Sequence, residues 1–201
     1  RRAVGIARSL NADLAVITGD FVSGYGDPLE ECIAELSLLT VPLGTWGCNG
    51  NHEIYAGVED AAAQLFQQYG MRLLRQKAAQ ISWRGAAFNL IGVDYQHDVQ
   101  LTGSKLPSLQ GIRSLVRRDM PNILLSHNPN TFHRAAEEGI ELSLAGHTHG
   151  GQVVIEIVHR SWNPAKFMTP VIAGLYELPM SAGLNHREAR TARLYVNRGI
   201  G

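Results

Sequence analysis

The chain has 201 residues, 45% of them hydrophobic, which is enough to bury one substantial core in a single domain and excludes a disordered chain. Lys plus Arg and Asp plus Glu each total 18, so the formal net charge is zero and no long-range field favours long nucleic acids as partners. Two cysteines exclude a disulfide framework, and no apolar run reaches the roughly 20 residues that span a bilayer, so we expect a soluble segment.

The N-terminal quarter alternates helices with a short apolar strand. Residues 1–10 have the pattern of the later part of a helix that lacks a start signal. Residues 12–18 are typical of a buried strand, which Gly19-Asp20 follows. A helix is then predicted over residues 27–39, with Asp27 as its N-cap.

A second strand and helix flank the next polar motif. A weak strand over residues 44–48 leads into Gly50-Asn51-His52-Glu53, where the glycine permits a tight turn. Residues 59–69 are predicted to form a helix that Gly70 terminates.

The C-terminal half continues this alternation. Strands are predicted over residues 81–83, 87–94, 121–126, 140–145 and from Arg193 onward, with a helix from Asn128 to about Glu138. His127 follows the third of these strands, and Gly146-His147-Thr148-His149 follows the fourth. The unstarted first helix and the glycine-rich last turn lead us to expect a single, partial α/β domain over residues 1–201, with flanking sequence missing at both ends.

The candidate site residues all lie just past the carboxyl end of a predicted strand. They are Asp20, Asn51, His127, His147 and His149. Ligands of α/β sheets bind at that edge, where the ends of neighbouring strands meet. We therefore expect these distant residues to converge on one site.

This combination of side chains is typical of a divalent metal site. A carboxylate, an amide oxygen and several imidazoles suit Zn, Mn or Fe(II). Two such ions about 3.5 to 4 Å apart can activate a bridging water and stabilise the attacking and leaving oxygens of phosphoryl transfer. Asp20 is the natural bridge, because its two oxygens can reach two cations and its charge offsets their repulsion. The spacing of His147 and His149 would let neighbouring imidazoles reach neighbouring metals.

The ordered motifs resemble the signature of the calcineurin-like metallophosphoesterase superfamily. That signature runs Asp-x-His, Gly-Asp, Gly-Asn-His-Glu or Gly-Asn-His-Asp, a His, and Gly-His-x-His, and four of its five blocks occur here in order. The phrases Ser-His-Asn-Pro at 126–129 and Tyr-Val-Asn-Arg-Gly at 195–199 look closest to a bacterial branch of membrane-associated or exported phosphodiesterases, some acting on lipid-linked pyrophosphates. The resemblance implies an αββα sandwich of two mixed sheets flanked by helices.

The same resemblance implies roles for individual residues. One metal would be held by Asp20, Asn51, His127 and His147, and the other by Asp20 and His149 with the Asp and His of the first block. His52 would stabilise the transition state or protonate the leaving oxygen. No Asp-x-His precedes Gly19-Asp20, so only one of the two metal sites is complete in this chain.

Three further polar residues have weaker signals. Glu53 is expected to be a supporting carboxylate rather than a ligand. Asp94, at another strand end, either lines the substrate cleft or has no role. Arg198 has a planar donor fork that could meet a substrate phosphate, although a simple surface arginine is the alternative interpretation.

We therefore expect a dinuclear metal-dependent phosphoesterase that hydrolyses a phosphodiester, a phosphomonoester or a pyrophosphate, lipid-linked substrates included, through a metal-bridging hydroxide. Two alternatives stay open: a degenerate one-metal module that binds without catalysis, and a nucleotide phosphodiesterase or nuclease. Any membrane anchor or export signal would lie in the missing flanks. The sequence does not determine the compartment, the oligomeric state or the substrate-binding residues.

Overall fold

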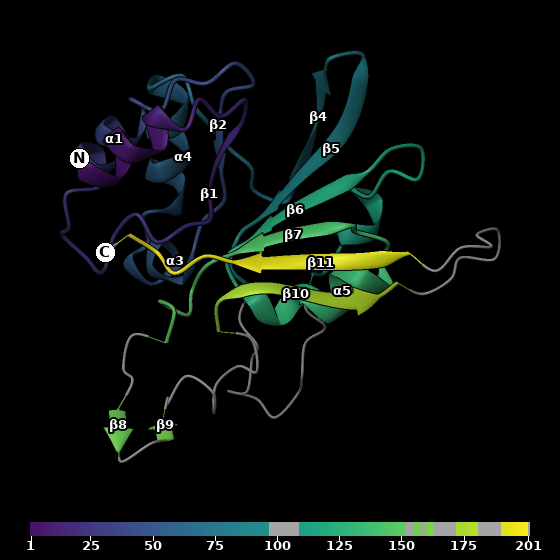
Figure 1. Cartoon of the computed structure of the whole chain (residues 1–201). Coiled ribbons are helices and arrows are strands. Elements are labelled where there is room, and N and C mark those ends of the chain that lie inside the picture. Colours follow the sequence, from purple (N-terminus) through teal and green to yellow (C-terminus); the bar gives the residue numbers. More distant parts are fainter. Residues whose placement is uncertain (97–108, 152–154, 158–159, 163–171, 181–189, 201) are drawn as a thin grey trace.

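Two β-sheets pack face to face at the centre of the fold, and helices cover the outer face of each sheet (Figure 1). This computed structural model describes residues 1–96, 109–151, 155–157, 160–162, 172–180 and 190–200. The layers follow the order helix, sheet, sheet, helix, which confirms the expected αββα sandwich.

The smaller sheet comes from the N-terminal part of the chain. Its strands β1 (Ala15–Ile17), β2 (Thr45–Gly47) and β3 (Arg72–Leu73) are parallel and lie in sequence order. The helices α1 (Arg2–Ser9), α2 (Leu29–Leu36) and α4 (Glu59–Gln68) pack against its outer face. Because the strands are parallel, the residues that follow β1 and β2 emerge at the same edge.

The larger sheet has six strands in the order β10-β11-β7-β6-β5-β4. Its parallel centre consists of β11 (Thr191–Val196), β7 (Leu142–Ala145), β6 (Asn122–Ser126) and β5 (Ala86–Val93). Antiparallel edge strands are β10 (Gly174–Pro179) and β4 (Lys77–Trp83). The outer face is covered by α5 (Phe132–Glu137) and by 3-10 turns at Ile112–Ser114 and Pro129–Thr131. A separate antiparallel pair is formed by β8 (Ile155–Ile157) and β9 (Arg160–Trp162).

The strands β5 and β6 in the middle of the larger sheet are buried on both faces over most of their length, which explains their largely apolar sequences. On β6, Leu124 packs in the cluster beneath α5, whereas Leu125 packs between the two sheets. Neighbouring residues of a strand point to opposite faces, so both must be apolar when both faces are covered. Trp46 and Cys48 complete the layer between the sheets from the side of β2.

Asp27 does not cap α2, so that expectation is wrong. Pro28 precedes the helix, and no side chain caps its N-terminus. The Asp27 carboxylate instead accepts the N–H groups of Ser23 and Gly24 at 2.7 and 3.0 Å. Short acidic side chains commonly bond to nearby backbone in this way, and here the bond orders the loop after Asp20.

Two further features differ from the sequence-based expectations. The segment after Gly50 forms a helix, α3 (Asn51–Ala56), where only a tight turn was expected. The strands β3, β8, β9 and β10 were not predicted; β3 is too short to show a periodic pattern. Within the described part of the chain, no helix is long and apolar enough to cross a membrane.

Candidate metal site at the meeting of the two sheets

Asp20 lies in a strained turn directly after β1. Its φ is 59°, and that of the preceding Gly19 is 93°. A side chain at Gly19 would collide with the backbone of Gly50, and a side chain at Gly50 would collide with Asp20. The two glycines therefore let the turns after β1 and β2 touch, so that the Asp20 carboxylate and the start of α3 share one small space.

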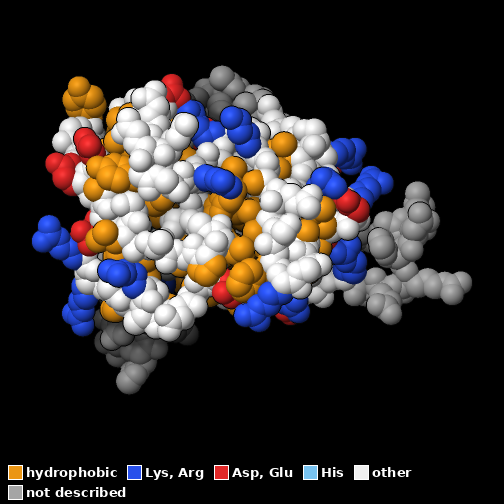
Figure 2. All heavy atoms as spheres, turned by 90° about the horizontal axis from the view of Figure 1, so that it is seen from above, with side chains coloured by type: hydrophobic (Ala, Val, Ile, Leu, Met, Phe, Trp, Pro, Cys, Tyr) orange, Lys and Arg blue, Asp and Glu red, His pale blue; other side chains and the backbone are white. Residues whose placement is uncertain are grey.

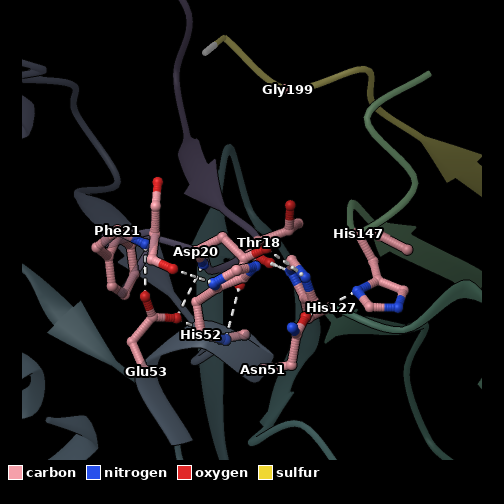
Figure 3. Close-up of polar contacts among 12 residues, drawn as sticks. Thr18, Asp20, Phe21, Asn51, His52, Glu53, His127, His147 and Gly199 are labelled. Atoms are coloured by element: carbon pink, nitrogen blue, oxygen red, sulfur yellow. Dashed lines mark hydrogen bonds and ion pairs between the residues drawn. The ribbon is translucent and has the colours of Figure 1, made fainter. Parts of the chain in front are cut away.

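Glu53 holds these two turns together (Figure 3). Its carboxylate is fully buried and accepts four backbone N–H groups, from Asp20 (2.9 Å), Phe21 (2.6 Å), Val22 (3.2 Å) and Gly50 (2.7 Å). A buried carboxylate is stable only when its oxygens are satisfied in this way. Glu53 is thus a supporting carboxylate, as the sequence predicted, but it orders backbone rather than an imidazole.

His127 comes from the other sheet, directly after β6, and is buried. Its Nδ1 contacts the backbone oxygen of Thr18, and a carbonyl oxygen can only accept, so Nδ1 carries the proton. Its Nε2 lies 3.0 Å from Oδ2 of Asp20 but has no hydrogen-bond partner. These two atoms therefore face each other inside the protein.

The carboxyl of Asp20 is biased toward its charged form. Burial alone would raise its pKa, but contacts with His127 and with the backbone of His52 outweigh burial and hold the pKa below its usual range. One of those contacts is the His52 N–H, which lies 3.2 Å from Oδ1 of Asp20. Asp20 is therefore a charged oxygen donor at neutral pH.

His147 follows β7 and lies beside Asn51. Its Nδ1 is 2.8 Å from Oδ1 of Asn51, and its ring is 5.0 Å from that of His127. Burial, and then the neighbouring His127, lower the pKa of His147 to about 4, so its imidazole is neutral at physiological pH. A neutral imidazole is the form that binds a metal.

Three of the predicted ligands form one cluster. The ligand atoms of Asp20, His127 and His147 all lie within 4.8 Å of one another. Asn51, also buried, adds its amide oxygen next to His147. Gly146 makes this approach possible, because a Cβ there would lie 3.0 Å from Oγ1 of Thr18.

His149 lies apart from that cluster. It is exposed in the turn after β7, with a φ of 49°. Among the described residues, the potential metal-binding group of His, Cys, Asp and Glu side chains does not include it. His149 as a ligand of a second metal therefore stays a prediction.

Three candidate ligands have a strained backbone conformation, as do four described non-glycine residues outside the site. Asp20, His147 and His149 have φ values of 59°, 72° and 49°, all in the left-handed region. A non-glycine residue in that region costs roughly 1 kcal/mol or more, and such strain gathers at functional sites because the surrounding structure must enforce it.

His52 lies at the opening of the site, on the first turn of α3 (Figure 3). Its Nδ1 lies 2.7 Å from the backbone oxygen of Ser23 and therefore donates to it. This bond leaves Nε2 as the ring atom available to a bound molecule. The Asp27 carboxylate stabilises the same loop by binding the N–H of Ser23.

Two tyrosines connect His52 to the cluster. The Tyr55 ring lies 6.3 Å from the His52 ring and 6.4 Å from the Tyr95 ring. Tyr95 in turn lies 5.4 Å from His147 and 6.2 Å from His127. Neither tyrosine was expected from the sequence, although Tyr95 lies two residues past the end of β5, where the strand-end rule could have identified it.

Asp94, the other candidate at the end of β5, is occupied by structural contacts. Its carboxylate accepts Nδ2 of Asn49 at 2.9 Å and Nε of Arg75 at 2.8 Å. These bonds tie the ends of β2 and β5 together across the two sheets, which favours a structural role over one in a substrate cleft.

Asn197, which was also not expected from the sequence, bridges the two sheets next to the site. Its Nδ2 donates to Oγ1 of Thr18 at 2.8 Å and to the backbone oxygen of Ala145 at 2.7 Å. Its Oδ1 accepts the N–H of Gly199 at 2.9 Å. The segment after β11 is thereby anchored to the ends of β1 and β7.

The chemistry of the donor set fits a divalent cation. The Nε2 atom of His127 lies 3.0 Å from Oδ2 of Asp20, yet this buried ring atom has no hydrogen-bond partner among the described residues. A cation bound by both would satisfy both, and the neighbouring Asn51 oxygen and His147 nitrogen would add further donors. Mixed oxygen and nitrogen donors of this kind suit Zn, Mn or Fe(II) better than Ca²⁺.

Comparisons with known proteins agree on one family. Residues 1–151 match the sequence model of the calcineurin-like phosphoesterases. A Bos taurus protein named transmembrane protein with metallophosphoesterase domain is 30% identical over 206 residues, which cover 98% of this chain and 43% of the relative. Phosphodiesterase YaeI of Escherichia coli is 26% identical over 212 residues, or 99% of this chain and 67% of the relative.

A solved structure supports the same fold. NAD nucleotidase of Haemophilus influenzae has a TM-score of 0.54 and 14% identity, over 96% of this chain and 42% of that chain. At this identity the likeness concerns the fold alone. The chain therefore corresponds to less than half of the bovine relative and of this solved structure.

Proposed function

The chain belongs to the calcineurin-like phosphoesterase family, and from that premise we propose that it forms the core of a metal-dependent hydrolase of phosphoric esters. The observation that carries the proposal is the convergence of Asp20, His127 and His147, whose ligand atoms lie within 4.8 Å of one another although the residues follow three different strands of two sheets. The family uses divalent metals, and this cluster is suited to hold one.

Different residues of the chain would hold the metal and position its ligands. Asp20, Asn51, His127 and His147 would hold a cation, the first through its charged carboxylate and the two histidines as neutral imidazoles. Divalent cations bound at such a site would polarise phosphoryl oxygens and provide a nucleophile from water. Glu53 and Thr18 would keep the ligands in place, through the backbone of Asp20 and through Nδ1 of His127.

His52 is the proposed partner of the leaving group. Its Nδ1 is engaged by the Ser23 carbonyl at 2.7 Å, so a proton on Nε2 could be donated to the oxygen that departs from phosphorus. The same charged ring would stabilise negative charge that develops on that oxygen. Because the Ser23 loop fixes the ring, its proton would be presented in a defined direction.

The proposed substrates are phosphodiesters, phosphomonoesters or pyrophosphates. An E. coli relative is named a phosphodiesterase, which supports the first class. Lipid-linked substrates and a membrane-associated parent protein also belong to the proposal, and the bovine relative named as transmembrane supports the latter.

Figure 2 shows Lys and Arg side chains scattered over the visible face rather than joined in a broad basic patch, which speaks against long nucleic acids. A second metal, with His149 among its ligands, is a further part of the proposal.

The test uses the full-length protein, stripped of metal with a chelator and reloaded with Mn, Zn or Fe(II). Hydrolysis of bis(p-nitrophenyl) phosphate, p-nitrophenyl phosphate and a nucleoside diphosphate ester would be measured beside the bound metal. His127→Ala should lower both the metal content and the rate. His133→Ala is the matched control, because His133 is an exposed histidine on α5, outside the cluster, and this variant should behave as wild type.

Two outcomes would count against the proposal. A metal-loaded protein that hydrolyses none of the three substrates would favour the alternative of a metal-binding module without catalysis. Equal metal content in His127→Ala and His133→Ala would contradict the ligand set itself.

A further inference from the structure

The segment after β11 brings Arg198 to the candidate site. Since β11 is parallel to β7 and Val196 pairs with Ala145, the chain leaves β11 at the edge where His147 and His149 follow β7. Asn197 then donates its N–H to the backbone oxygen of Ala145 at 2.9 Å. Figure 1 shows this last segment running from the end of β11 toward the smaller sheet.

The side chain of Arg198 lies over the turn that carries the two histidines. A Cβ built on Gly150 would come within 2.9 Å of Cγ of Arg198 and within 3.2 Å of its Cβ and Cδ. Gly150 has a φ of 63°, so glycine suits the position by conformation as well as by space. The aliphatic part of Arg198 therefore lies beside Gly150, the residue that follows His149.

The guanidinium of Arg198 has no acidic partner in the described part of the chain, and the residue is exposed. Arg193, five residues earlier and on β11, instead pairs with Glu177 at 2.8 Å. An arginine that lies beside the site without an acidic partner is suited to bind a ligand, because its planar fork can donate two parallel hydrogen bonds to a phosphate.

We propose that Arg198 binds the non-bridging phosphoryl oxygens of the substrate, on the side of the site formed by the turn of His147 and His149. This proposal rests on the proposed phosphoesterase function and adds a substrate-binding residue to it. The anchoring bonds of Asn197 to Thr18 and Ala145 hold the Arg198 backbone at a fixed place relative to both sheets. The ligand class is a phosphoryl group with at least two free oxygens, which esters and inorganic phosphate share.

The experiment compares Arg198→Ala, Arg198→Lys and Arg193→Ala in the full-length protein. Steady-state hydrolysis of bis(p-nitrophenyl) phosphate and competitive inhibition by inorganic phosphate would be measured at fixed Mn. For Arg198→Ala we expect KM and the inhibition constant of phosphate to rise about tenfold or more, the size of a lost charged hydrogen bond, with a smaller change in kcat. Arg198→Lys should lie between it and wild type, because the charge remains without the fork. Arg193→Ala should match wild type.

Calorimetric titration of the Mn-loaded protein with inorganic phosphate separates this proposal from the function. If wild type hydrolyses no ester, the proposed function fails, and a weaker phosphate affinity in Arg198→Ala still supports the role of Arg198. The proposal is overturned if Arg198→Ala binds phosphate as tightly as wild type, or if Arg193→Ala weakens binding equally. A variant that loses its cooperative thermal transition is replaced in this comparison by Arg198→Lys, whose phosphate affinity must then fall below that of wild type.

Discussion

The carboxylate of Glu53 accepts the backbone N–H of Asp20 at 2.9 Å, although the two residues lie 33 positions apart in the chain. The same Oε2 atom accepts the N–H of Gly50 at 2.7 Å, which closes the turn that starts α3. One buried side chain thus sets the relative position of a candidate metal ligand and of the helix that carries Asn51 and His52. The left-handed conformation of Asp20 is imposed by these contacts.

Glu53→Gln should loosen this arrangement. The amide keeps the shape of the carboxylate, but its NH₂ group faces N–H groups that need an acceptor, and the negative charge is lost. We expect the free energy of unfolding to fall by about 2 to 3 kcal/mol, measured by urea denaturation of the metal-free protein, together with a weaker Mn affinity. Glu137→Gln is the control, because Glu137 is exposed and pairs with Arg134 on the surface of α5. Its free energy of unfolding should change by less than about 0.5 kcal/mol. A larger change would show that the loss in Glu53→Gln does not depend on the buried position of Glu53.

Asn197→Ala should release the segment after β11. The variant loses donors to Thr18 and Ala145 and the acceptor for Gly199, and we expect a loss of stability of about 1 to 3 kcal/mol. Because Arg198 depends on this anchor, phosphate affinity should fall in parallel. Thr191→Ala, at the exposed start of β11, should change neither the thermal midpoint nor phosphate binding. Full stability in Asn197→Ala would show that the two sheets hold this segment without the side-chain bonds.

The rule that ligands gather past strand ends identified much of the cluster from the sequence. Asp20, His127 and His147 follow apolar runs whose ends are easily recognised. Parallel pairing aligns the ends of β6 and β7, and the packing of the two sheets brings the end of β1 to them. The rule locates the end of each strand. It does not give the direction in which the side chains of the following turn point. His149 fits the same rule, yet the turn of Gly150 leaves it exposed and outside the cluster.

The supporting contacts were harder to predict, because they join side chains to backbone atoms far away in the sequence. Glu53 has a helix position that suggests a capping box, but nothing local shows that its carboxylate also serves Asp20 and Phe21. Asn197 lies in a turn-like stretch with no periodic pattern. Its side-chain amide reaches Thr18 only because the two sheets pack face to face. The distance between the sheets is set by the core that lies between them.

The depressed pKa of His147 makes the stability of the metal-free protein depend on pH. Its pKa is about 4 in the folded chain, against an ordinary value of 6.5. As pH falls from about 6.5 toward 4, His147 is protonated in the unfolded chain but stays neutral in the folded chain. The free energy of unfolding therefore decreases over this pH range, and the full contribution is present above it. Allowing for the partial exposure of His147, we expect this residue to account for about 1 kcal/mol between pH 7.5 and pH 5.

His147→Gln removes this titration. In urea denaturation with a chelator present, the loss of stability from pH 7.5 to pH 5 should be smaller in His147→Gln than in wild type by that amount. His133→Gln, which changes an exposed histidine on α5, should keep the wild-type pH dependence. Identical pH profiles for wild type and His147→Gln would contradict the neutral state of this partly buried ring.

The proposed role of His52 can be separated from metal binding by the choice of leaving group. His52→Gln removes the proton donor while its backbone N–H can still reach Asp20, so the bound Mn should stay at the wild-type level. We expect kcat to fall about 10²- to 10⁴-fold for an ester with an alkyl leaving group, which needs a proton to depart. The loss should be much smaller for p-nitrophenolate, which departs without a proton.

Tyr55→Phe, beside His52, is the control for a change close to the ring. Its kcat should not depend on the leaving group in this way. An equal loss for both leaving groups would instead assign His52 to stabilisation of charge on the phosphoryl group, and an unchanged kcat would remove it from the mechanism.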